Sequence, residues 1–197
     1  GDVSEVADTH NATTTVIMTN DFSITATFVE EGKLALYIDS TDGGSVTDPG
    51  EGLFSYNYSD VVDLVANATG GYLFVMWTGD TDDITDAYDA TTTIEMLDDC
   101  AITANFVTSG LYALIISSTD GGSVIDPGEG LFEYAPSTVV NITAQPNEGW
   151  WFGWWGGTAT ANVTNPVADE WAANTTITMD GNYTLEAAFI TVGSFNL

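Results

Sequence analysis

The chain has 197 residues, of which 44% are hydrophobic, and its formal net charge is −28 at pH 7 with a single Lys and no Arg. This apolar content is too high for a disordered acidic tail, so we expect packed cores. A surface this acidic repels phosphate backbones and anionic headgroups, and no apolar run reaches the length of a membrane span, so we expect neither a nucleic-acid partner nor membrane insertion.

One stretch occurs twice and sets the organisation of the chain. Residues 40–54 read STDGGSVTDPGEGLF, and residues 118–132 repeat them with a single difference, Thr47 against Ile125. The copies lie 78 residues apart, and the match continues on both sides, with about five extra residues in one loop of the second copy. A fixed period of this length predicts tandem structural modules.

The repeat divides the chain into four parts. Met18 aligns with Met96 and Phe28 with Phe106, so the chain starts with a partial module. The predicted parts, in chain order, are the C-terminal half of a module (1–32), a complete module (33–110), a second complete module (111–190) and a tail strand (191–197).

Apolar and polar residues alternate within each part, as in Ile24 to Phe28 and Ile102 to Phe106. This period of two predicts half-buried antiparallel strands, about five or six in each complete module, and no segment shows a helical stripe. The Asp-Gly-Gly and Asp-Pro-Gly sequences of the duplicated stretch predict the turns of an entry hairpin. Asp98-Asp99 and Asp180-Gly181 are expected to turn a hairpin between the last two strands.

The order of motifs resembles the divergent internalin-B B-repeat modules of bacterial and archaeal surface proteins. It runs from G-G-S-V and D-P-G-x-G through G-Y/W-x-F-x-x-W-x-G and T-T-I-x-M to T-x-x-A-x-F, over nearly the whole chain. The most specific positions in the first complete module are Gly71, Tyr72, Phe74, Trp77, Ala104 and Phe106. The resemblance implies small all-β, β-grasp-like modules in an elongated arrangement on extracellular proteins, and it implies no catalytic residues.

Asn-x-Ser/Thr sequons are the clearest chemical signal in the chain. Seven Asn residues lie in such sequons, and none has Pro at the middle position, namely Asn11, Asn57, Asn67, Asn141, Asn162, Asn174 and Asn182. Thr-rich strands create some sequons by chance, but the number favours N-glycosylation of a secreted, surface-exposed protein. Dense sequons on such modules also favour an archaeal source.

The loop from Gly79 to Asp89 is rich in acids. Calcium takes six to eight oxygen ligands, so this loop is a candidate calcium site formed by Asp80, Asp82, Asp83, Asp86 and Asp89. The alternative is a solvated acidic loop, because the Gly turn and terminal Glu of an EF-hand are missing. A second acidic set, Asp42, Asp48 and Glu51 with its copy in 120–129, is better explained by turn formation.

The second module carries the sequence GWWFGWWGG. Phe152 and Trp155 align with core positions, whereas Trp151 and Trp154 replace Leu73 and Met76. We therefore expect Trp151 and Trp154 to cover a contact between modules or subunits, or alternatively to stack on sugar rings.

Nothing in the sequence indicates an enzyme. Cys100 shares its position with Phe22 and Tyr183, which indicates packing, and His10 is isolated in a loop, so no nucleophile–base pair or zinc cluster is formed.

The partial module at the start has no leading strands of its own. The leading hypothesis is a glycosylated extracellular filament of identical subunits, in which the tail strand of one copy completes the partial module of the next. A carbohydrate-binding adhesion module or a stalk segment of a larger surface protein is the alternative.

Overall fold

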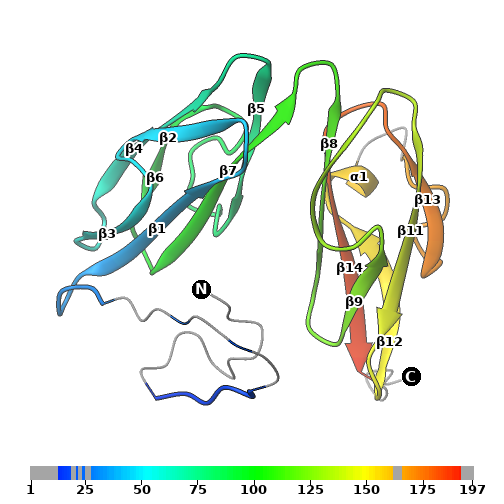
Figure 1. The fold of residues 1–197 in the computed structure, drawn as a ribbon. Helices are drawn as coiled ribbons and strands as arrows, with labels where there is room; N and C mark the ends of the chain where they lie inside the picture. The colour runs from blue at the N-terminus through cyan, green and yellow to red at the C-terminus, as the bar shows by residue number, and fades with distance from the viewer. Residues whose placement is uncertain (1–12, 19–20, 22–23, 25–27, 162–165, 192–197) are drawn as a thin grey trace.

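The computed structural model describes residues 13–18, 21, 24, 28–161 and 166–191. The predicted tail beyond Thr191 and most of the partial module lie outside these residues. The described part consists of two β-modules side by side, with one four-residue helix, α1 (Thr158–Ala161), in the longer loop of the second module (Figure 1). The all-β tandem prediction is confirmed, whereas an elongated arrangement is not.

Each complete module contains seven strands, more than the five or six predicted. The first module comprises β1 (Leu34–Ser40), β2 (Gly44–Asp48), β3 (Gly52–Tyr56), β4 (Val61–Ala68), β5 (Tyr72–Gly79), β6 (Thr91–Glu95) and β7 (Cys100–Thr108). The second comprises β8 (Tyr112–Ser118), β9 (Gly122–Asp126), β10 (Gly130–Tyr134), β11 (Val139–Pro146), β12 (Trp150–Gly156), β13 (Asn174–Thr178) and β14 (Tyr183–Thr191).

The seven strands form two sheets in each module. The first module has a four-stranded sheet of order β3-β1-β7-β5 and a three-stranded sheet of order β2-β4-β6. The second repeats this arrangement as β10-β8-β14-β12 and β13-β11-β9. The first and last strands of a module pair in parallel, with Leu36 opposite Cys100 and Leu114 opposite Tyr183, so both ends of the module meet in the centre of one sheet.

Two hairpin predictions are wrong for the same reason. β1 and β3 do pair antiparallel, but the duplicated stretch between them sends β2 to the other sheet. Likewise β6 and β7 belong to different sheets, so Asp98-Asp99 turns a crossover and not a hairpin. Alternation along a strand reports which residues are buried but not which strand lies beside it, because both sheets bury their inner faces against the same core.

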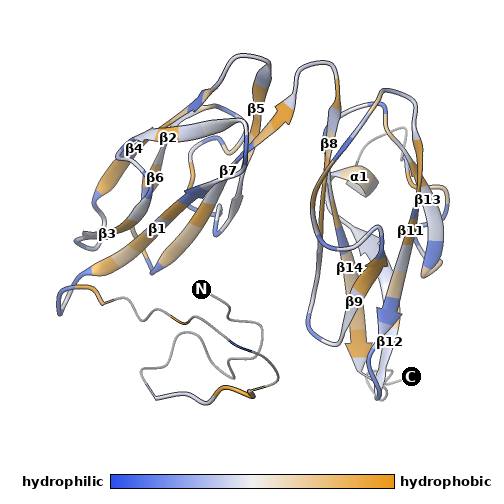
Figure 2. Ribbon diagram, in the orientation of Figure 1, coloured by the Kyte–Doolittle hydropathy of each residue, from blue (hydrophilic) through white to orange (hydrophobic). Residues whose placement is uncertain are grey.

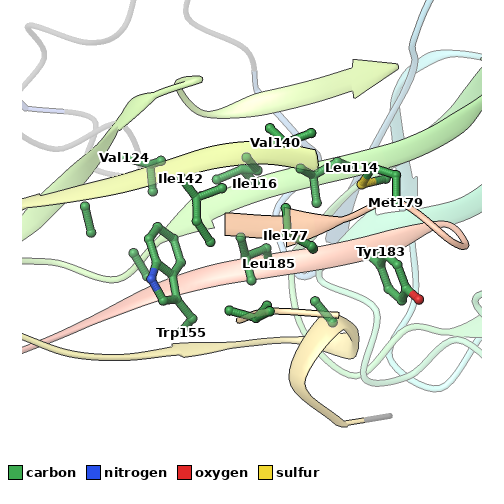
Figure 3. Close-up of a cluster of buried hydrophobic side chains, with 14 of the residues drawn as sticks. Leu114, Ile116, Val124, Val140, Ile142, Trp155, Ile177, Met179, Tyr183 and Leu185 are labelled. Carbon is green, nitrogen blue, oxygen red and sulfur yellow. The ribbon is translucent and has the colours of Figure 1, made fainter. Parts of the chain in front are cut away.

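The cores lie between the two sheets of each module. Trp77 is 2% exposed and Trp155 is 1% exposed, and each indole Nε1 donates a hydrogen bond to a loop carbonyl, that of Asp89 at 3.0 Å and that of Ala172 at 2.9 Å. Figure 3 shows Trp155 among the aliphatic side chains of the second core. Burying an indole with its N–H satisfied combines a large apolar area with no unpaired donor, which explains why this position is Trp in both modules.

Two glycines of the duplicated stretch allow the two sheets to approach each other closely. A Cβ on Gly43 would overlap the Tyr72 ring, and a Cβ on Gly44 would overlap the Phe106 ring. The same clashes arise at Gly121 with Trp150 and at Gly122 with Phe189. The Asp-Gly-Gly sequence is therefore repeated because aromatic rings occupy the space of the missing side chains.

Candidate functional site: the outer face of the four-stranded sheet

A third apolar cluster joins the two modules. Val75 and Met76 on β5 and Val107 on β7 are buried together with Ala113 on β8, and three further side chains of the second module pack against them, namely Leu111, Ile115 and Leu131. Figure 2 shows apolar residues on β7 and β8, where the chain passes from one module to the next. Because Phe106 and the other inward residues fill the module cores, this cluster is built from side chains of the opposite, outer face.

Polar groups at the joint are also paired. The Thr108 backbone N–H donates to Glu133 Oε1 of the second module at 2.8 Å. Asn105 is 3% exposed, and its amide group donates to the Thr78 hydroxyl at 2.8 Å and to the carbonyl oxygens of Met76 and Thr103 at 3.2 and 3.1 Å. The Asn105 bonds satisfy a buried amide within the first module, and the Thr108–Glu133 bond crosses from one module to the other, so the joint has a polar contact as well as an apolar one.

The outer face of each four-stranded sheet therefore has two halves. We call the β5 and β7 residues of the joint cluster the trailing half-face of the first module, which is Val75, Met76 and Val107. The trailing half-face of the second module consists of their counterparts on β12 and β14, which are Gly153, Trp154 and Ile190. We call the outward residues of the first strand and its neighbour the leading half-face, which is Ala35, Tyr37 and Leu53 in the first module and Ala113, Ile115 and Leu131 in the second. The joint consists of the first module's trailing half-face on the second module's leading half-face.

The trailing half-face of the second module is uncovered. Met76 is 3% exposed, whereas its counterpart Trp154 is 44% exposed. Trp151 and Trp171 are also exposed, and the rings of Trp154 and Trp171 lie 6.5 Å apart in a tilted arrangement. The sequence identified Trp151 and Trp154 but missed Trp171, which aligns with the exposed Tyr88 in a loop, and an exposed loop residue carries no periodic signal.

The leading half-face of the first module is also partly uncovered. Tyr37, the counterpart of Ile115, is 46% exposed. Ala35 and Leu53, the counterparts of Ala113 and Leu131, are intermediate in exposure. The sequence analysis missed Tyr37, although its alignment with Ile115 placed an apolar ring at an outward position.

The five described sequon residues are exposed: Asn57, Asn67, Asn141, Asn174 and Asn182. Three of them lie on strands of the three-stranded sheets, Asn67 on β4, Asn141 on β11 and Asn174 on β13, whereas Asn57 directly follows β3 and Asn182 directly precedes β14, both strands of four-stranded sheets. Asn11 and Asn162 lie outside the described residues. Three of the five accessible sequon residues therefore lie on the sheets opposite the joint, whereas Asn182 lies beside it, because its Oδ1 accepts a hydrogen bond from the Ala113 N–H at 2.9 Å.

The structure does not bring the five acids of the calcium prediction together. Asp80 accepts a hydrogen bond from the Ala101 N–H, Asp86 from the Tyr88 N–H and Asp89 from the Thr91 N–H, each at 2.9 Å. Asp86 and Asp89 line an open hollow of about 290 Å³, whereas Asp80, Asp82 and Asp83 do not. In the described part of the chain, no three His, Cys, Asp or Glu side chains are grouped in a way that could hold a metal ion. Three of the five carboxylates thus accept hydrogen bonds from backbone N–H groups of the loop and of the strands β6 and β7.

The second acidic set also has a structural role. Glu51 Oε1 accepts hydrogen bonds from the Ser40 hydroxyl at 2.7 Å and the Val46 N–H at 3.0 Å, and Glu129 repeats both contacts with Ser118 and Val124 at the same distances. Each Glu thereby ties the start of the crossover to its end. Of this set, Asp42 and Asp120 lie in turns, as predicted, whereas Asp48 and Asp126 end strands β2 and β9.

Cys100 and Tyr183 occupy equivalent positions, as the alignment predicted. Burial raises the pKa of the Cys100 thiol, and the nearby carboxylates, Asp80 first among them, raise it further. Burial and a hydrogen bond to Asp180 raise the pKa of Tyr183 to about 12. A thiol that stays protonated is a poor nucleophile, which agrees with a packing role for this position. His10 lies outside the described residues.

Comparison with known proteins agrees with the internal repeat. The family model of the divergent InlB B-repeat domain matches residues 34–110 and again residues 112–193. Comparisons with curated proteins and with solved structures gave no match. Among the described residues, no helix is both long and apolar enough to span a membrane. B-repeat modules occur typically in surface proteins, so the tandem indicates a surface-protein repeat, and because the two matches cover most of its length, the chain belongs to the divergent InlB B-repeat family.

Proposed function

We propose that this chain is a glycosylated, extracellular structural subunit that assembles head to tail with copies of itself. The family indicates a surface-protein repeat. The acidic surface and the dense, accessible sequons support an extracellular and archaeal setting, and the covalent partners are N-glycans on the seven sequon residues. In this proposal the chain performs no catalysis and needs no metal ion.

The observation that carries assembly concerns two side chains of the partial module. Met18 is 67% exposed and Phe28 is 84% exposed, although the residues aligned with them, Met96 and Phe106, are each 0% exposed. Two side chains at core positions of a module are therefore exposed in this chain. Exposed apolar side chains of this kind favour aggregation unless a partner covers them.

Strand donation supplies a specific way to cover them. In both complete modules the first strand lies in parallel beside the last strand, in the centre of the four-stranded sheet. Residues 191–197 align with 108–114, so their last three residues fall on the start of a first strand. A copy that placed this segment beside residues 21–29 of its neighbour would extend the pairing from subunit to subunit.

Deletion of residues 192–197 tests strand donation, because it leaves β14 intact. We expect the wild-type chain to form polymers visible by negative-stain electron microscopy and the shortened chain to form none. Unchanged polymers from the shortened chain would refute strand donation.

Glycosylation is tested separately on material isolated from the native source. We expect intact mass analysis to show glycan mass, and peptide mapping after glycan release to place it on sequon Asn residues. Unmodified sequons in native material would contradict this part of the proposal.

A second candidate function has one observation in its favour. The exposed indoles of Trp151, Trp154 and Trp171 offer flat apolar rings of the kind on which sugar rings stack. A carbohydrate-binding adhesion module predicts that Trp154→Ala abolishes glycan binding and leaves polymers unchanged.

A further inference from the structure

The two uncovered half-faces form a complementary pair. We propose that the trailing half-face of the second module docks on the leading half-face of the first module of another copy, and so repeats between chains the contact that joins the two modules within one chain. The proposal rests on the proposed head-to-tail assembly and adds a docking surface that is separate from the donated strand.

The argument starts from equivalence between the modules. Within the chain, β5 and β7 of one module present Met76 and Val107 to Ala113, Ile115 and Leu131 of the next, and this contact is mainly apolar, with the Thr108–Glu133 hydrogen bond beside it. The second module places Trp154 and Ile190 on the equivalent strands, β12 and β14, at the same register. Met76 pairs with Asn105 in the first module, and Trp154 pairs with Ala188, the counterpart of Asn105, in the second. The backbone that carries the uncovered surface is therefore the one that already forms a joint.

The receiving surface is equivalent as well. Ala35 and Tyr37 on β1 and Leu53 on β3 take the places of Ala113, Ile115 and Leu131, and Tyr37 pairs with Leu53 just as Ile115 pairs with Leu131. The substitutions match each other in kind, because the joint cluster contains Met76 and Ile115, whereas the proposed contact has the aromatic residues Trp154 and Tyr37 at these positions. Buried Trp and Tyr residues dominate the binding energy of protein interfaces.

The two half-faces of the proposed contact include no sequon residue. Asn67, Asn141 and Asn174 lie on the three-stranded sheets, while Asn57 and Asn182 lie at the ends of strands of the four-stranded sheets. Glycans on Asn67, Asn141 and Asn174 would therefore extend from the other side of each module. A glycan-binding platform would not need a matching apolar surface on the first module, whereas docking of copies does.

Two different half-faces on different modules give an open, head-to-tail contact. Such a heterologous contact does not close on itself and propagates from copy to copy. Two chains that each carry a net charge of −28 repel one another. High salt should therefore strengthen the association, because at about 1 M ionic strength the screening length falls to roughly 3 Å.

The test uses two complementary variants of the full chain in sedimentation velocity experiments at high salt. Trp154→Glu blocks the trailing half-face and Tyr37→Glu blocks the leading half-face. Val61→Glu and Val139→Glu serve as controls, because these residues are 66% and 62% exposed on the three-stranded sheets and add the same charge, one in each module. We expect wild type and both controls to form oligomers that grow with concentration.

Each blocked variant alone should be monomeric, with an association constant reduced roughly thirtyfold or more, as for an interface aromatic residue. An equimolar mixture of the two should form dimers and nothing larger, because one intact half-face remains on each partner. Formation of this dimer also shows that both variants are folded. Dimers formed by Tyr37→Glu alone would overturn the proposal, because they would show that the Trp surface binds itself.

A wild-type chain that stays monomeric up to about 1 mM would also overturn the proposal. If that monomer bound oligosaccharides and Trp154→Glu did not, the surface would be a glycan site. The chain that lacks residues 192–197 separates this inference from strand donation. If the shortened chain forms oligomers and Trp154→Glu abolishes them, the result supports half-face docking and refutes strand donation. If Trp154→Glu leaves these oligomers unchanged, the result refutes half-face docking.

Discussion

The two modules share an interior and differ at one outer surface. Trp77 and Trp155 fill the same core position, and the duplicated crossover has the same hydrogen bonds in both. On the trailing half-face, Met76 is covered by the next module while Trp154 is exposed. The two modules therefore share the residues that form the core and the crossover, and they differ at the surface that contacts the next module in one case and is exposed in the other.

The sharpest test of the shared interior is removal of the core indole. Trp77→Ala and Trp155→Ala should each destabilise their own module by about 3–5 kcal/mol, because each leaves a large cavity and an unused loop carbonyl. Denaturant unfolding followed by intrinsic fluorescence measures the loss. The cost of such a substitution depends on how far the surrounding residues collapse into the cavity. A difference of more than about 2 kcal/mol between the two losses would therefore show that the two cores are not equivalent.

The difference between the trailing half-faces predicts unequal effects of truncation. Met76→Ala should cost the monomer about 2–5 kcal/mol, because it opens the buried joint. Trp154→Ala should change monomer stability by no more than about 0.5 kcal/mol, because the side chain is half exposed and lies on the surface. Both are measured by thermal unfolding at concentrations where the chain is monomeric. Equal losses would show that the two surfaces do not differ as described.

The duplicated glutamate predicts a smaller, matched effect. Glu51→Ala and Glu129→Ala each remove two hydrogen bonds to a carboxylate, and each should cost about 1–3 kcal/mol. Chemical denaturation of both variants measures the cost, and Glu133→Ala, whose acid contacts the joint and not the crossover, is the comparison. A neutral result in one module alone would show that its crossover is held by other contacts.

The smallest expected effect concerns Tyr183, whose counterpart in the first module is Cys100. The folded state holds the pKa of Tyr183 near 12, above the ordinary value of 10.0, so the protonated phenol stabilises the fold. This contribution is fully present below pH 10 and is lost as the pH rises from 10 to about 12. Tyr183→Phe should make stability less dependent on pH in that range.

Ultraviolet titration of the phenols checks this prediction directly. One of the eight Tyr residues should ionise later than the others in wild type, and this late step should be missing from Tyr183→Phe. A wild-type titration without the late step would contradict the assigned environment.

Much of the candidate site could be inferred from the alignment alone. Trp151 and Trp154 were expected at a contact because Leu73 and Met76 stand in their places, and the structure places Met76 in the joint and Trp154 on the uncovered counterpart. Tyr37 and Trp171 were missed. Tyr37 follows the alternation of its strand like any half-buried residue, and only the joint, where its counterpart Ile115 packs against the preceding module, marks this outward position as a possible contact.

The acids illustrate the opposite error. Five Asp residues within eleven positions are compatible with calcium, but three of them accept hydrogen bonds from separate backbone N–H groups, those of Tyr88, Thr91 and Ala101. Composition reports which groups are available, whereas metal binding depends on whether several oxygens converge on one point. That convergence is a property of the folded loop.

The sequence by itself determined the all-β class, the period of the repeat, the family and the inward residues of most strands, because hydrophobic alternation and turn residues act over a few neighbouring positions. Only the tertiary structure decided which strands pair, which sheet each strand enters and where the two modules touch. These features depend on residues far apart in the chain, such as Leu36 paired with Cys100 and Met76 in one buried cluster with Ala113, and no local pattern encodes such contacts.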